Sequence, residues 1–210
     1  MKKLDLVKIN SCAPYAVKED TQEGAYTFIA DSGAEFSIGF MPDDLIRSDE
    51  SYEFIIGNLN GVKSPRDKKV KATVIAIVEE FFNANKATML FLCSTSDGKQ
   101  LMRGRLFKNW FDTYKYRNRF TMVTSTLLDE YGIDNVASVI IRNDNPNLGK
   151  VLAEFGETIE MFSHKPSLGW QIQYSSFEWR QAQSDTAVGN KNKYSINNSI
   201  ILVVAILSHH

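Results

Sequence analysis

The spacing of apolar residues changes along this chain from every second residue to every third or fourth, and this change constrains the fold more than any single motif. Across residues 26–40, apolar side chains alternate with polar or smaller ones around a turn at residues 31–33, which is typical of a β-hairpin. Across residues 70–82 they recur at helical spacing, which predicts an amphipathic helix. Residues 89–93 form a continuous apolar run, as expected of a strand covered on both faces. The chain therefore combines strands with the helices that cover them.

The remaining segments complete a predicted order of strands and helices. Three further strands are predicted at residues 52–56, 120–123 and 136–141. Helices are predicted to begin at the cap Ser64-Pro65, at residues 94–98 and at the cap Asn145-Pro146, and to end near residues 82, 116 and 165.

The order βββ-α-β-α-ββ-α predicts an α+β fold in which helices flank a mixed sheet. A strand, a helix and a second strand in succession usually form a right-handed parallel crossover. Within residues 70–82, the helical period places Thr73, Glu79 and Glu80 on the side away from the core.

Composition divides the chain into two predicted parts. The 210 residues are 43% hydrophobic, which is enough for one globular domain, and we assign it to residues 1–165. Residues 166–210 are poor in charge and rich in Asn, Gln and Ser, so we expect a peripheral strand or a poorly ordered tail. The longest apolar run, residues 200–207, is too short to cross a bilayer, and no membrane contact is expected. Because two cysteines do not form a disulfide scaffold, the cytoplasm is the expected compartment.

The histidine count excludes several kinds of catalytic site. Only His164, His209 and His210 are present, and the last two end the chain, where residues are seldom held rigidly. His164 is expected at a helix end, where the helix dipole favours a cation. The sequence contains no CxxC, HExxH or GxSxG motif and no GxxxxGKS/T motif, and no metal site is predicted. An enzyme of this sequence would use carboxylates, tyrosines, lysines or a cofactor.

Six segments carry a resemblance to a known family. They are DSGAEFSIGF at 31–40, YEFIIGN at 52–58, SPRD at 64–67, CSTSDGKQ at 93–100, RGRLFKNWF at 103–111 and IIRNDNP at 140–146. Across residues 13–165 the chain resembles domain of unknown function 6169, a small family seen mainly in Bacteroidetes. The resemblance implies no assigned activity and therefore supplies no catalytic residue.

Opposite charges are concentrated in different parts of the chain. Residues 1–60 hold five Lys or Arg and eleven acids, whereas residues 99–120 hold seven Lys or Arg and one acid, Asp112. This distribution predicts a dipolar surface. Within residues 99–120 the cations are interleaved with aromatic residues. The anion-binding candidates are Lys99, Arg103, Arg105, Lys108, Trp110 and Tyr114, with Arg142 before the last helix.

Arg103 differs from the other cations of this segment. On a helix with 100° per residue it falls inside the apolar side, about 20° from Trp110. A buried guanidinium needs a partner, because an unpaired one costs several kcal/mol. One alternative is an anionic ligand in a cleft, bound through its phosphate or carboxylate. The other is an acid of the chain itself, and the candidates are Asp97, Asp129 and Asp144.

Three functions are compatible with these features. We favour a non-catalytic binding module that meets an acidic protein or a nucleic acid through residues 99–120. An inhibitor or antitoxin-like protein, whose dipolar charge selects its partner, is a further alternative. The sequence does not decide whether the chain is an enzyme, nor its oligomeric state.

The remaining alternative is an atypical or degenerate N-acetyltransferase-like enzyme. The predicted element order is similar to the core of the GCN5-related N-acetyltransferases, in which a Gly-rich loop cradles the pyrophosphate of acetyl-CoA. This similarity implies a phosphate loop at Arg66, Lys69 and Lys71, where lysines stand in place of glycines, and a general-acid role for Tyr114. Acetyl-CoA is expected only under this alternative, and no other cofactor is predicted.

Overall fold

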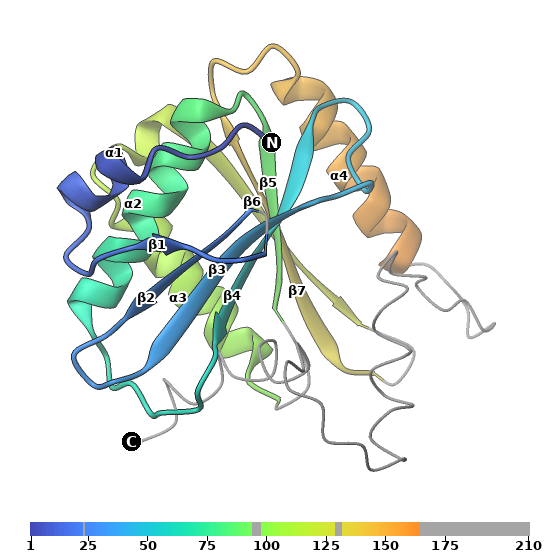
Figure 1. Cartoon of the computed structure of the whole chain (residues 1–210). Coiled ribbons are helices and arrows are strands. Elements are labelled where there is room, and N and C mark those ends of the chain that lie inside the picture. The colour runs from blue at the N-terminus through green and yellow to red at the C-terminus, as the bar shows by residue number, and fades with distance from the viewer. Residues whose placement is uncertain (23, 94–97, 129–131, 164–210) are drawn as a thin grey trace, which may run out of the picture.

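The fold is built on one seven-stranded mixed sheet with helices on both faces (Figure 1). The computed structural model describes residues 1–163 apart from residues 23, 94–97 and 129–131. The elements are α1 (Leu6–Cys12), β1 (Lys18–Glu19), β2 (Ala25–Ile29), β3 (Glu35–Pro42), β4 (Ser51–Asn58), α2 (Lys68–Ala84), β5 (Thr88–Cys93), α3 (Gln100–Asp112), the short 3-10 helix η1 (Arg117–Arg119), β6 (Phe120–Leu128), β7 (Asp134–Arg142) and α4 (Leu148–Ser163).

The order of strands across the sheet is β1-β2-β3-β4-β5-β7-β6. Neighbours are antiparallel except for β4 and β5, which are parallel and are joined through α2. The α+β class and the mixed sheet are thus confirmed.

Three helices cover one face of the sheet and the fourth covers the other. In Figure 1, α1, α2 and α3 lie on one side of the strands and α4 lies alone on the opposite side. Two separate clusters of buried side chains fill these layers. In β3, Phe36, Ile38 and Phe40 alternate toward the three-helix side and are at most 4% exposed. The period-2 pattern of the sequence therefore selects which face meets α1 and α2.

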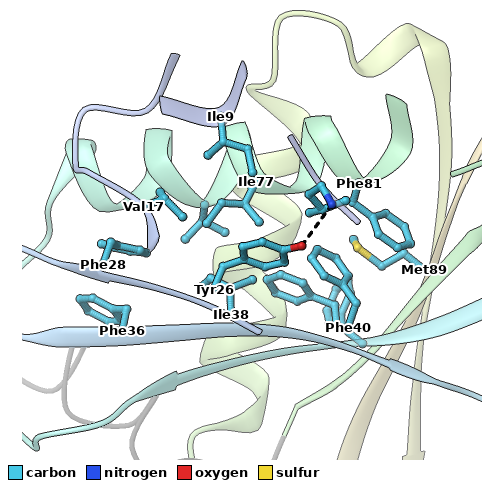
Figure 2. Close-up of a cluster of buried hydrophobic side chains, with 14 of the residues drawn as sticks. Ile9, Val17, Tyr26, Phe28, Phe36, Ile38, Phe40, Ile77, Phe81 and Met89 are labelled. Carbon is cyan, nitrogen blue, oxygen red and sulfur yellow. Dashed lines mark hydrogen bonds between the residues drawn. The ribbon is translucent and has the colours of Figure 1, made fainter. Parts of the chain in front are cut away.

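Aromatic side chains dominate the larger cluster (Figure 2). The rings of Phe40 and Phe81 stack at 4.3 Å between centroids, which ties β3 to α2. The hydroxyl of the buried Tyr26 accepts a hydrogen bond from the backbone N–H of Leu4, so the one polar atom of that side chain is satisfied.

The bounds of three helices differ from the sequence predictions. The first begins at Lys68 rather than after Ser64, because the Asp67 carboxylate caps it by accepting the Lys69 N–H at 2.7 Å. The second spans residues 100–112, and the chain then turns and forms η1 instead of continuing to residue 116. The last begins at Leu148. Asn145, which was predicted to cap this helix, instead lies in a turn that precedes α4, where its side chain accepts the N–H of Asn147.

The prediction that Thr73 and Glu80 face away from the core is wrong. Both are buried, at 0% and 5% exposure, because α1 packs on that side of α2. The Thr73 hydroxyl accepts the backbone N–H of Tyr15, and a Glu80 carboxylate oxygen accepts that of Asp5. The N-terminal segment thus supplies partners for the polar groups that it buries. The sequence reading missed both α1 and β1.

The predicted tail, residues 166–210, and His164 lie outside the described residues. Among the helices that the structure describes, none has the length and apolar character needed to span a membrane.

Candidate functional site

Arg103 points into the protein from α3. Its side chain is 3% exposed and lies near Cys93 at the end of β5. The next residue, Gly104, allows α3 to pack closely against β7, because a Cβ at this position would lie 2.8 Å from Cγ1 of Val136 on β7. Burial raises the pKa of the Cys93 thiol to about 11, against the opposing effect of the Arg103 charge. Burial thus disfavours the thiolate form of Cys93, as expected of a core cysteine.

Of the three acids considered as partners of Arg103, only Asp144 lies among the described residues. Asp97 and Asp129 lie outside the described residues. Asp144 is held by Arg142, whose Nε and Nη2 donate to the two carboxylate oxygens at 2.7 and 2.6 Å. This pairing lowers the pKa of Asp144 to about 2. Arg142 also donates to the carbonyl of Phe82, so this candidate is tied into the fold.

The aromatic residues of α3 line an apolar groove between α2, α3 and the sheet. Trp110 meets Phe107 edge to face at 5.5 Å, and Phe107 contacts Phe54 and Phe91 of the sheet. The groove holds a cavity of about 100 Å³. Its lining is Phe54, Val74, Ile75, Val78, Glu79, Phe82, Met89, Phe91, Phe107, Trp110, Phe111, Tyr114, Phe120 and Ile140. Trp110 is therefore half-buried in this packing.

Among the described residues that line this groove, only Tyr114 carries a hydroxyl, and this hydroxyl forms a hydrogen bond with Glu79. The Tyr114 hydroxyl donates to Oε1 of Glu79 at 2.7 Å. Burial first, and then this hydrogen bond, raise the pKa of Tyr114 far above its ordinary value. The phenol is thus fixed as a neutral donor that joins the end of α3 to α2. Sequence reasoning missed this role of Glu79, because the helical period placed Glu79 on the side away from the core and no local pattern connects it with Tyr114.

The other cation candidates of α3 lie nearer the surface. Lys99 is half-buried, and Arg105 is exposed. Lys108 is exposed and forms an ion pair with Asp112 one turn later. After α3, the chain adds Lys115, Arg117 and Arg119, all of which are exposed.

The start of α2, where a phosphate loop was considered, already holds carboxylates of this chain. Asp67 accepts both the Lys69 N–H and the Tyr15 hydroxyl. The ammonium group of Lys69 pairs with Asp31 at 2.7 Å, and that of Lys71 donates to the Thr113 hydroxyl at 2.6 Å. Arg66 is exposed. The structure thus separates the ammonium groups of these two α2 residues, because that of Lys69 lies at Asp31 and that of Lys71 lies at Thr113, the residue after α3.

The parallel strands β4 and β5 separate soon after they begin. They pair only at Ser51–Glu53 with Thr88–Leu90. Beyond these positions, β4 continues along β3 and β5 continues along β7. The carboxyl ends of adjacent strands in open sheets that contain parallel strands are a frequent ligand position. Sequence reasoning missed this divergence, because strand pairing over long range leaves no local pattern.

One carboxyl group lies at this divergence. Glu53 is the last β4 residue paired with β5, and its side chain is half-buried. Burial, followed by the charge of Asp43, raises the pKa of Glu53. Among the residues that the structure describes, no cluster of three or more His, Cys, Asp or Glu side chains could hold a metal ion.

A comparison with known families finds a match to the central part of the chain. This part contains α2, β5, α3, β6, β7 and the first turns of α4. Residues 66–157 match the family of unknown function DUF6169. This part of the chain is therefore similar to that family, which bears out the resemblance stated from the sequence for residues 66–157. The DUF6169 match includes Arg103, the paired Arg142 and the residues that line the apolar groove except Phe54, but not β1 to β4. No curated protein matches the chain.

Proposed function

We propose that this chain is a non-catalytic binding module that takes an acidic polypeptide on a basic surface. The basic surface consists of side chains on α3, on η1, on the turn between them and on the adjoining part of α2: Lys71, Arg105, Lys108, Lys115, Arg117 and Arg119.

The observation that supports the proposal is that the acidic segment 43–50 and the basic surface lie on opposite faces of the sheet. The acidic segment 43–50 lies on the α4 side, where the backbone N–H groups of Arg47 and Ser48 donate to the Glu154 carboxylate. The basic surface is built from helices on the opposite side. The acids of residues 1–60 that could repel an anionic partner are thus partly turned away from it.

The state of the aromatic residues favours a polypeptide over a nucleic acid. Base stacking needs exposed rings. Of the six aromatic residues between 107 and 120, only Tyr116 is exposed, at 40% of its surface, and Lys115 lies over its ring at 4.5 Å. The remaining cations can still attract carboxylates, which need no stacking partner.

The test is the binding of a labelled poly-glutamate peptide, measured by fluorescence anisotropy over a series of salt concentrations. We expect binding that weakens as salt rises, because exposed charges are screened beyond about 8 Å at physiological ionic strength. Arg117→Glu with Arg119→Glu should weaken binding at least about tenfold, or about 1.4 kcal/mol. The matched control is Lys150→Glu, an exposed residue on α4. Equal losses in both variants, or tighter binding of a single-stranded oligonucleotide than of the peptide, would refute the proposal.

The divergence of β4 from β5 favours a second candidate, an atypical acyl-CoA-dependent enzyme. Beyond the point where β4 leaves β5, the β4 backbone offers hydrogen-bonding groups, and the half-buried carboxylate of Glu53 offers a base at that point. Asp67 weighs against it, because a carboxylate at the α2 start repels a pyrophosphate. Acetyl-CoA is the probe: a rise in melting temperature that adenosine diphosphate alone does not produce supports the enzyme, and no rise at saturating ligand excludes it.

We further propose that the module works in the cytoplasm. Cys12 is a free, exposed thiol and Cys93 is a free, buried one. An exposed free thiol is suited to a reducing compartment.

A further inference from the structure

The two edges of the sheet differ in a way that bears on assembly. The edge strand β1 has only two residues, Lys18 and Glu19, and both are charged and exposed. The opposite edge, β6, has nine residues, FTMVTSTLL, without a charge or a proline. Natural sheets protect their edges with short strands, charges or prolines, because an unpaired strand is a template for another chain. By this criterion β1 is protected and β6 is not.

The strand β6 is held as a regular strand by its neighbours. All nine of its residues pair with β7 in an unbroken antiparallel register. Phe120 packs against Phe82 and Tyr114 at one end, and the Thr124 and Ser138 hydroxyls are 2.9 Å apart in the middle. No strand among the described residues pairs with its other side. The outer edge of β6 is therefore an ordered row of backbone donors and acceptors.

We propose that two copies of this chain pair through β6, antiparallel about a two-fold axis, so that their sheets join into one. This inference goes beyond the proposed binding function and does not depend on it. A two-fold axis makes the same strand contribute to both sides of the interface. An uncharged strand suits this arrangement, because no like charges are brought opposite each other.

Symmetry also fixes the register. In an antiparallel pair, hydrogen-bonded and non-hydrogen-bonded residue pairs alternate. Two-fold symmetry therefore requires one residue to face its own copy. Full overlap of the nine residues makes this residue Thr124, with Val123 opposite Ser125 and Met122 opposite Thr126 of the second copy. Thr124 and Thr126 are exposed, so substitutions at these positions do not disturb the core of the single chain.

A second copy is a better occupant of this edge than a charged peptide, since β6 offers no counter-charge along its length. A strand from residues 200–207 of the same chain is the competing occupant, because this run is uncharged too. The two occupants differ in mass: a second copy doubles the mass of 23.8 kDa, and the chain's own segment leaves it unchanged.

The experiment measures mass by light scattering for the full-length chain and its variants. We expect a dimer for the wild type and monomers for Thr124→Lys and for Thr124→Glu, because each places two like charges face to face across the axis. Mixing the two variants should restore the dimer as a mixed pair, which a folding defect would not do. A monomeric wild type overturns the proposal, as does a mixture that stays monomeric.

Cysteine cross-linking tests the register independently, in a chain that carries Cys12→Ser to remove the exposed thiol. Thr124→Cys should form an intermolecular disulfide under mild oxidation, because facing Cα atoms lie roughly 4.5–5.5 Å apart. The matched control is Thr126→Cys on the same strand, whose copies would be roughly 13 Å apart along the strands. Cross-linking of Thr126→Cys as fast as of Thr124→Cys would overturn the assigned register.

Discussion

The helix α3 packs closely against β7 at Gly104, so the effect of Gly104→Ala on the free energy of unfolding should depend on one neighbouring side chain, Val136. In Gly104→Ala, the new Cβ would lie 2.8 Å from Cγ1 of Val136 and 3.4 Å from its Cγ2. Overpacking of this kind costs about 1–3 kcal/mol. The same substitution inside a helix gains about 1 kcal/mol, because alanine is the better helix former. The net result in the wild type is a loss of up to about 2 kcal/mol.

Removing the neighbour reverses this result. Val136→Ala deletes the two methyl groups that the new Cβ would meet, at the cost of a cavity in the core, since Val136 is 4% exposed. In that background, Gly104→Ala keeps its helical gain and loses its clash, so we expect it to stabilise the protein by up to about 1 kcal/mol.

The assay is urea unfolding of the four proteins of this double-mutant cycle, followed by circular dichroism. The expected coupling between the two sites is about 1–3 kcal/mol and favourable. If Gly104→Ala changes the free energy of unfolding by the same amount in both backgrounds, α3 does not sit against Val136, and the placement of Arg103 inside the fold fails with it.

Three further predictions follow from single side chains. Phe81→Ala should lower the free energy of unfolding by about 3–5 kcal/mol in urea titration, because Phe81 is fully buried; a loss below about 1 kcal/mol would contradict its place in the core. Glu53→Gln should be more stable than the wild type at pH 7, because burial and the charge of Asp43 raise the folded-state pKa of Glu53 above 4.5. Ionisation of Glu53 therefore lowers the stability of the wild type as the pH rises, and the difference between the two proteins should shrink toward pH 4. A difference that is the same at both pH values would refute this cause. Asp144→Asn should lower the urea midpoint at neutral pH, because Arg142 depresses the folded-state pKa of Asp144 from 3.8 to about 2. This stabilisation is complete above pH 3.8 and is lost as the pH falls from there through about 2, so an effect of the substitution that does not shrink over this range would exclude the ion pair as its cause.

Local pattern was sufficient for the elements that carry their own periodicity. The alternation of Phe36, Ile38 and Phe40 identified β3 and its buried face, and the continuous apolar run identified β5. The helical period also placed Arg103 on the inner side of α3, where it is buried. These features depend on neighbours within a few residues, which the sequence contains in full.

The candidate site was predicted less completely, because its contacts join distant segments. Lys69 and Arg142 were considered as anion ligands, but each is paired with an acid of the chain, Asp31 and Asp144. The Tyr114–Glu79 hydrogen bond joins residues that lie 35 positions apart. A charge in a sequence does not state which opposite charge will lie beside it once the chain has folded.

The sequence by itself determined the α+β class, the order of the main strands and helices, and the inward side of α3, since all three follow from short-range periodicity and chain connectivity. Only the tertiary structure decided that β4 leaves β5 after three pairs, that the acidic segment 43–50 packs beside α4, and that the uncharged β6 lies at an edge of the sheet. The physical reason is that pairing and burial are set by long-range packing. A strand has the same local sequence whether it lies in the middle of a sheet or at its edge, and only its neighbours in space distinguish the two.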